Sequence, residues 1–273
     1  MSPLFWCLLV FAAVCVVVWV LSMLTNEHSW VDRIWSVVPV VYAWIFAASA
    51  GLGDLRLNVV ATLITLWGIR LTFNFARKGG YKRGGEDYRW QILRSRMPGW
   101  QFQVFNIFFI TIYQNILLLL ITLPMLTMTQ NPRPFGALDV IATIVFAGFL
   151  VGETTADQQQ WNFHQRKNSD IAAGRQPNPR FLQSGLFSVS RHPNFFFEQA
   201  QWWVVFFFGA IAAGSVLQWT VAGAVLLTVL FIGSTSFTES ISKSRYPEYA
   251  DYQARTSALI PWFPRRGAAT RTA

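Results

Sequence analysis

The sequence predicts an all-α integral membrane protein with about seven transmembrane helices, and three observations support this fold class. Seven apolar runs approach the roughly 20 residues that a helix needs to cross a bilayer. Only 13% of the residues are charged, whereas about a quarter is usual in a soluble domain. Basic residues are concentrated in alternate loops, as expected for a chain that crosses the membrane repeatedly.

The apolar runs place the predicted spans at about residues 4–24, 34–52, 57–75, 102–128, 138–160, 195–213 and 216–237. The first run has no basic n-region and no small-residue cleavage site, so we expect a retained helix rather than a signal peptide. The fifth is apolar only to about Gly152 and continues as a polar helix. We predict a single transmembrane domain over residues 1–273, in which residues 238–273 form a cytosolic tail that packs on the bundle.

Glycine and proline mark the predicted breaks between spans. Residues 51–54 contain two glycines and predict a short turn, and the two prolines within residues 131–134 predict another. Residues 213–215 predict a very tight hairpin. Within the second span, Pro39 is expected to bend the helix.

The distribution of basic residues predicts the orientation. With the N-terminus outside and the C-terminus cytoplasmic, 19 of the 22 Lys and Arg residues lie in inside segments. The long polar loops are then all on the cytosolic face. This asymmetry is typical of a membrane enzyme that uses a cytosolic cofactor, whereas transporters more often carry polar residues at mid-membrane.

Other classes find little support in the sequence. The net charge is +9, but no dense basic tract lies outside the loops, so nucleic acid is not an expected partner. Cys7 and Cys15 lie in one apolar run, and we expect them to serve only as small apolar side chains in packing. His164 has no Cys or further His nearby, so no metal site is predicted. No obligate protein partner is evident; the expected partners are the lipid bilayer and a hydrophobic small molecule.

The most concentrated polar stretch is residues 185–198, which lies at the mouth of the sixth span. Arg191 offers a bidentate fork for phosphate, and His192 adds a donor near neutral pH. Pro193 is placed where a helix would start, and free N–H groups there favour an anion. Asn194 and Glu198 complete the cluster. This pattern indicates pyrophosphate binding without a Rossmann fold, since no Gly-x-Gly-x-x-Gly motif follows a strand.

Two ionisable residues belong to the early spans. Asp32 lies at the start of the second span, where it is either an N-terminal charge favoured by the helix dipole or a substrate-orienting acid. Arg70 follows Trp67 in the third span. It either extends to the interface or pairs with an acid such as Asp32, because a buried guanidinium needs a partner.

Three further polar segments can each be interpreted either as purely structural or as part of a functional site. Residues 84–90 predict either a surface amphipathic helix or a lid over a cofactor. Glu153 and Asp157 are four residues apart and share one helix face, which suits a ribose hydroxyl, an amide or an ion pair with Arg191. Tyrosines at three-residue spacing follow the seventh span. These tyrosines are Tyr246, Tyr249 and Tyr252. They either form an aromatic belt at the membrane interface or, together with Lys243, close over the phosphates of a cofactor.

These residues together resemble the steroid 5-alpha-reductase C-terminal family, most closely its poorly characterised bacterial branch. The resemblance covers spans two to seven. It is carried by Gly185-Leu-Phe, Ser190-Arg-His-Pro-Asn-Phe, Glu198, Trp202, Trp67-Gly-x-Arg70-Leu71, Glu86-Asp-x-Arg89 and Tyr249-x-x-Tyr252 with Thr256 and Ile260-Pro261.

The resemblance implies a seven-span bundle that holds NADPH on the cytosolic side and reduces an activated C=C bond in a lipid or sterol-like substrate. Arg191, His192, Lys243 and Tyr246 would contact phosphates and ribose, with Tyr249 beside them. Asp157, Asn194 and Glu198 would fix the nicotinamide and ribose end. The implied location is the bacterial inner membrane, in a multi-pass arrangement.

On the substrate side, Asp32 stands where the family has a Glu, and Trp67 stands where it has a Tyr. With Arg70 they would form the catalytic set. Tryptophan donates a hydrogen bond but cannot act as an acid, so Trp67 departs from the pattern of steroid 5-alpha reduction.

Two alternatives remain open from the sequence. The Arg-His-Pro-x-aromatic motif is also similar to the isoprenylcysteine carboxyl methyltransferases, which bind S-adenosylmethionine. Basic loops suit a phosphorylated dinucleotide better than a sulfonium. The other alternative is a non-catalytic lipid-binding or transport protein, which the one-sided polar clustering disfavours.

Overall fold

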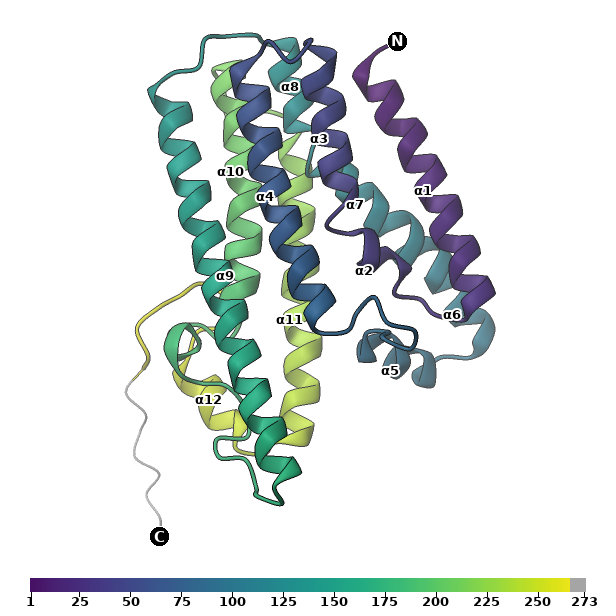
Figure 1. The fold of residues 1–273 in the computed structure, drawn as a ribbon, viewed down its shortest axis with the longest axis vertical. Helices are drawn as coiled ribbons and strands as arrows, with labels where there is room; N and C mark the ends of the chain where they lie inside the picture. The colour runs from purple at the N-terminus through teal and green to yellow at the C-terminus, as the bar shows by residue number, and fades with distance from the viewer. Residues whose placement is uncertain (266–273) are drawn as a thin grey trace. The chain divides into compact units, whose positions relative to one another are not determined.

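The structure is a computed structural model that describes residues 1–265, and these residues contain helices and no strand (Figure 1). Within them, seven helical segments are long and apolar enough to cross a membrane. They are Pro3–Thr25, Trp30–Ser49, Leu55–Arg77, Gly99–Gln130, Ala137–Ala172, Pro193–Ala213 and Val221–Arg245. The predicted all-α class with seven candidate spans is confirmed. The sides on which the termini lie stay a prediction.

The chain divides into two compact units, which are described separately. Unit 1 comprises residues 1–146 and 202–226, and unit 2 comprises residues 147–201 and those from 227 onward. The single domain over residues 1–273 therefore stays a prediction.

Unit 1 begins with α1 (Pro3–Thr25), α2 (Trp30–Ile34), α3 (Val38–Ser49) and α4 (Leu55–Arg77). The second span is interrupted between α2 and α3, directly before Pro39, whose ring cannot continue a helix from the preceding turn. Helices α3 and α4 pack side by side. Gly68 makes this approach close, because a Cβ there would lie 2.6 Å from the carbonyl oxygen of Ser36.

The fourth span contains a π-helical stretch. It runs through α6 (Gly99–Phe105), η1 (Asn106–Tyr113), α7 (Gln114–Leu120) and α8 (Pro124–Gln130), of which η1 is the π-helix. The wide π turn brings side chains four residues apart nearly above one another. The rings of Phe105 and Phe109 accordingly stack at 4.8 Å between centroids, and those of Phe109 and Tyr113 at 5.3 Å.

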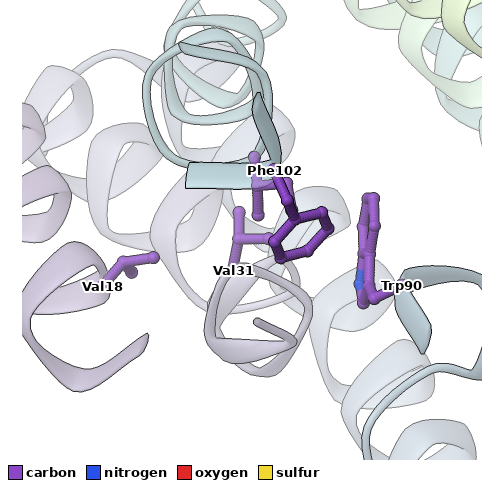
Figure 2. Close-up of a cluster of buried hydrophobic side chains, with 5 residues drawn as sticks. Val18, Val31, Trp90 and Phe102 are labelled. Atoms are coloured by element: carbon purple, nitrogen blue, oxygen red, sulfur yellow. The ribbon is translucent and has the colours of Figure 1, made fainter. Parts of the chain in front are cut away.

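A buried apolar cluster joins α1, α2 and the fourth span to α5 (Tyr88–Arg96). Figure 2 shows the ring of Phe102 between Val31 and the ring of Trp90, with Val18 of α1 on the other side of Val31. This cluster anchors the loop and helix that follow α4 onto the start of the second span.

A buried ion pair closes the other end of unit 1. Arg56 on α4 contacts both carboxylate oxygens of Asp139, at 2.6 and 2.8 Å. Asp139 lies in the first turn of α9 (Ala137–Ala172), where a negative charge is favoured by the helix dipole. Arg56 also donates to the carbonyl oxygens of Arg133 and Pro134, which fixes the proline turn between α8 and α9.

Unit 2 contains the rest of α9, the short η2 (Gly185–Ser188), and α12 (Tyr249–Arg255). It also contains the first part of α10 (Pro193–Ala213) and the last part of α11 (Val221–Arg245). The predicted helix start at Pro193 is confirmed. Inside this unit, Gly152 gives space to the ring of Phe197, whose atoms would lie 2.6 Å from an added Cβ.

Three predicted boundaries were wrong. The seventh helix begins at Val221 rather than Val216, because residues 214–220 form a loop whose apolar residues looked like helix in the sequence. Val216, Leu217 and Trp219 are in fact 63%, 89% and 61% exposed. The fifth helix continues to Ala172 instead of 160, since hydropathy marks only its apolar part. The seventh continues to Arg245, so the tail begins later than residue 238.

Candidate functional site

Glu239 on α11 is the residue to which Arg191 and His192 of the 185–198 stretch both bind. Its carboxylate accepts hydrogen bonds from Nε and Nη2 of Arg191, at 2.6 and 2.9 Å. Nε2 of His192 lies 3.0 Å from the same carboxylate, and Nε2 of Gln253 lies 2.7 Å from it. Nη1 of Arg191 donates to the carbonyl oxygens of Gln253 and Thr256. The partner of Arg191 in these contacts is Glu239, not the Asp157 that the sequence also allowed.

The segment after α12 pairs with the backbone just before α10. The N–H groups of Arg191 and His192 donate to the carbonyl oxygens of Ser257 and Ala258, at 2.8 and 3.1 Å. Trp262 N–H donates to the carbonyl oxygen of Val189 at 2.9 Å. Within unit 2, the segment after α12 therefore lies against the 185–198 stretch; the packing of the tail on the bundle stays a prediction. These two N–H groups are engaged, so anion binding there would depend on the first turn of α10.

The three tyrosines surround one phenylalanine. The ring of Phe181 lies 5.8, 5.1 and 5.6 Å from the rings of Tyr246, Tyr249 and Tyr252. Tyr249 and Tyr252 are buried, and the hydroxyl of Tyr252 donates to the carbonyl oxygen of Phe187. Two of the three therefore pack inside unit 2 rather than forming an exposed aromatic belt.

Tyr246 differs from its two neighbours because basic side chains gather around it. Nζ of Lys167 donates to its hydroxyl at 2.9 Å and to the carbonyl oxygen of Arg180 at 2.7 Å. The guanidinium of Arg180 lies over its ring, 4.8 Å from the centroid, and reaches the carbonyl oxygen of Arg245 at 3.4 Å. Partial burial opposes ionisation, but Lys167 lowers the pKa of Tyr246 below its usual value. We call Lys167, Arg180, Arg245 and Tyr246 the basic set.

Buried carboxylates form a second feature of unit 2. Glu153 and Asp157 are each 3% exposed on α9, and Glu198 is 5% exposed on α10. Gln201, fully buried, donates to Glu153 at 2.6 Å. Asn194 is half-buried at the second position of α10, and Lys243 is exposed on the last turn of α11. Among residues 1–265, no three His, Cys, Asp or Glu side chains are grouped so as to hold a metal ion.

In unit 1 the loop after α4 is bound to residues 26–33 by a polar network. Arg33 contacts Glu27 at 2.6 Å and donates to the carbonyl oxygens of Gly80 and Lys82. Glu27 accepts from the N–H of Gly84 at 2.8 Å. Further along, Glu86 accepts from the N–H of His28 at 2.7 Å. The loop is thus held by backbone and charge contacts, not only by the apolar cluster of Figure 2.

Asp32 contacts this same loop. Its carboxylate accepts a hydrogen bond from Nε1 of Trp90 at 2.9 Å, while the Trp90 ring belongs to the apolar cluster. Asp87 and Arg89 lie close enough to influence it electrostatically, with opposite signs. The structure therefore joins Asp32 with residues 84–90, which the sequence presented as two separate features.

Trp67 and Asp32 have different neighbours. Trp67 is fully buried on α4, and its ring meets that of Trp202 edge to face at 4.9 Å. Arg70 lies one turn further along α4 and is half-buried. The three residues predicted for the substrate side all belong to unit 1.

Two residues central to these contacts had no role assigned from the sequence. Glu239 was visible only as a lone acid near the end of an apolar helix, and the need of Arg191 for a partner was the available signal. Lys167 lies in a long polar helix, where nothing in the sequence connects it with Tyr246. Both contacts join residues more than 45 positions apart, with separations of 48 and 79.

The fold and these polar sites define a multi-pass membrane protein with long polar extensions from its helices. The chain belongs to the family described as "Protein of unknown function (DUF1295)", whose model matches residues 18–256. It is also similar to an uncharacterized protein of the fission yeast Schizosaccharomyces pombe. The two are 40% identical over 261 residues, which cover 90% of this chain and 76% of the yeast protein. No solved structure matches the chain significantly.

Proposed function

We propose that this protein is a membrane-embedded, NADPH-dependent reductase of an activated C=C bond in a lipid or sterol-like substrate. The proposal starts from the resemblance to the steroid 5-alpha-reductase C-terminal family. One structural observation carries it further: unit 2 combines buried carboxylates, at Asp157 and Glu198, with the basic set around Tyr246. A phosphorylated dinucleotide offers the matching groups, since its hydroxyls and amide donate hydrogen bonds and its phosphates are anions.

The residues present fit such a cofactor. Asp157 and Glu198 would accept hydrogen bonds from ribose hydroxyls or the carboxamide, and Asn194 would donate or accept. Lys167, Arg180 and Arg245 carry three positive charges, and Glu248 offsets one of them through a contact of 3.3 Å with Arg180. Lys243 and the first-turn N–H groups of α10 would add to the attraction for phosphate.

Arg191 and His192 receive a positioning role in this proposal. An arginine side chain has five N–H donors, and four hydrogen bonds of Arg191 go to Glu239, Gln253 and Thr256. A direct phosphate contact would compete with these bonds. Tyr249 is 5% exposed and packs on Phe181, so it would act by shaping the site.

The protein's own chemical contribution would come from Asp32. In its protonated form, this carboxyl group would donate a hydrogen bond to the substrate carbonyl oxygen, while Trp90 Nε1 holds Oδ2 in place. Bound NADPH would supply the hydride that such a reduction requires, and water would supply the proton. Trp67 can donate a hydrogen bond but cannot exchange a proton, and Arg70 would support the carbonyl electrostatically.

Cofactor binding by the detergent-purified protein tests the proposal, with NADPH, NADH and S-adenosylmethionine titrated in parallel. We expect saturable binding of NADPH, weakened at least fivefold in Lys167→Ala because a charged hydrogen bond is lost. Arg175→Ala is the matched control, since Arg175 is exposed and pairs only locally with Asp170.

Other outcomes would replace the proposal. Binding of S-adenosylmethionine alone would move the protein to the methyltransferases and remove the role of Asp32. Binding of none of the three would favour a non-catalytic lipid-binding or transport protein. The bacterial inner membrane stays our predicted location, and a relative that is 40% identical to this chain comes from fission yeast.

A further inference from the structure

Three polar side chains are buried among the spans of unit 1 without a complete set of hydrogen bonds. Tyr42 on α3 and Asn115 on α7 are fully buried, and Thr111 on η1 is 2% exposed. Within residues 1–265, no hydrogen-bond partner is found for Tyr42 Oη, Thr111 Oγ1 or Asn115 Oδ1. We call these three side chains the polar trio.

The polar trio lies on elements that share one neighbour. Helix α1 packs against α3, η1 and α7, and α3 also packs against α7. Nδ2 of Asn115 donates to the carbonyl oxygen of Thr111 at 2.7 Å, and Sγ of Cys15 lies 3.9 Å from that oxygen. Cys15 is also an electrostatic neighbour of the Tyr42 hydroxyl. Asn115 and Thr111 are therefore in contact with each other, and Cys15 of α1 is a neighbour of both Thr111 and Tyr42.

Such groups are costly inside a membrane, where no bulk water compensates them. Most helical threonines avoid the cost by bonding to a carbonyl one turn earlier. In this chain Thr65 does so to Ala61 at 2.7 Å, and Thr143 does so to Asp139 at 2.8 Å. Thr111 lies in the π-helix, where its Oγ1 makes no such bond. Thr111 Oγ1 therefore lacks the hydrogen bond that Thr65 and Thr143 make.

Helix α1 is held to its neighbours by few polar contacts. Only Cys7, Val18 and Ser22 are buried along its 23 residues. Ser22 accepts a hydrogen bond from Nδ2 of Asn106 at 3.1 Å, and Cys15 makes the long contact with Thr111. Most of α1 is therefore turned away from the protein, and a molecule in the bilayer would reach the trio beside this helix.

We propose that the polar trio binds a neutral oxygen-bearing group, a hydroxyl or a carbonyl, of an otherwise apolar molecule taken from the bilayer. Tyrosine and threonine hydroxyls donate and accept, and the free Asn115 oxygen accepts, so the trio matches a hydroxyl or a carbonyl. The three side chains carry no positive charge, which disfavours a carboxylate or a phosphate. That the bound molecule is the substrate of a reductase rests on the proposed function; the binding itself does not.

Photolabelling of the full-length protein in detergent tests the site. The probe is a long-chain alcohol that carries a diazirine, and the matched probes are the corresponding alkane and fatty acid. We expect the alcohol to label residues 106–120, and labelling to fall at least fivefold in Tyr42→Phe and in Asn115→Leu. Thr65→Val is the control variant, because Thr65 already has its hydrogen bonds, and it should label like the wild type.

The outcomes separate this inference from the proposed function. Equal labelling by alcohol and alkane, or labelling that the trio variants leave unchanged, would overturn the inference. NADPH binding measured on the same preparations is independent of it. If labelling depends on the trio but NADPH does not bind, the proposed binding site is supported and the proposed reductase function is contradicted.

Discussion

Glu239 and Arg191 form a two-point hydrogen-bonded ion pair across 48 residues of sequence, at 2.6 and 2.9 Å. Because His192 and Gln253 reach the same carboxylate, one side chain connects α11 with the start of α10 and with α12. This carboxylate holds the 185–198 stretch within unit 2 together with the backbone bonds to residues 257–262.

Glu239→Gln should destabilise the protein by about 3–5 kcal/mol, the range for removing one partner of a buried ion pair. Both side chains are only 10% exposed, so the guanidinium would be left poorly compensated. Thermal unfolding in detergent measures the effect. Asp170→Asn is the control, because the pair of Asp170 with Arg175 is exposed and should contribute less than about 1 kcal/mol. Equal losses in the two variants would contradict the central role of Glu239.

Gly68→Ala should destabilise unit 1 by about 1–3 kcal/mol, as overpacking does. The added methyl would lie 2.6 Å from the Ser36 carbonyl oxygen and 2.8 Å from a methyl of Val40, so α3 and α4 must separate. Gly148→Ala is the matched change, since nothing lies within 4 Å of its Cβ position. There we expect a gain of about 0.5–1 kcal/mol from the better helix former. An equal loss of stability at both positions would show that the close approach of α3 and α4 is not the cause of the loss at Gly68.

The stability of the protein should fall between pH 7 and pH 5 through His28. Burial, followed by the charge of Arg94, lowers the pKa of His28 below its ordinary 6.5, although Glu86 opposes this. The unfolded chain then takes up a proton before the folded one does. The contribution of His28 is therefore complete above about pH 6.5 and is lost as the pH falls toward the lowered pKa.

The measurement is the unfolding temperature across this pH range in the wild type and in His28→Gln. The variant should have a shallower pH dependence because the residue no longer titrates. His164→Gln, at an exposed position, should leave the slope as it is. A slope that His28→Gln does not change would assign the pH dependence to other groups.

Trp90→Phe separates packing from hydrogen bonding at Asp32. The phenyl ring keeps most of the apolar contact with Val31 and Phe102, but the 2.9 Å bond to Asp32 is lost. We expect a stability loss of about 1–3 kcal/mol. If the proposed function is correct, turnover of an enone lipid should fall while NADPH affinity is kept. Trp100→Phe, at a position 69% exposed, should change neither quantity.

The spans and most breaks could be predicted because their causes are local. A run of apolar side chains and a proline act on their own few residues, so the helix start at Pro193 and the break before Pro39 were evident. The loop at residues 214–220 was missed because its exposed apolar residues carry the same hydropathy as a helix.

The contacts of the candidate site could not be predicted in the same way. Asp32 and Trp90 were each visible as chemical groups, but their contact depends on a loop that folds back over 58 residues. For Arg191, the sequence predicted a phosphate contact or an ion pair with Glu153 or Asp157 on the helix before it. The choice of Glu239 follows from tertiary packing, which no short pattern encodes.

The backbone pairing between residues 189–192 and residues 257–262 has a consequence for biosynthesis. The segment that precedes α10 leaves the ribosome well before its partner, with all of α11 and α12 between them. During that interval, the Arg191 and His192 N–H groups lack their carbonyl partners, and the two side chains lack the Glu239 carboxylate until α11 has been made. Unit 2 therefore completes these contacts only after α12 and the segment behind it have been made, and a ribosome stalled before residue 257 would hold a chain with all seven candidate spans but an unfinished site.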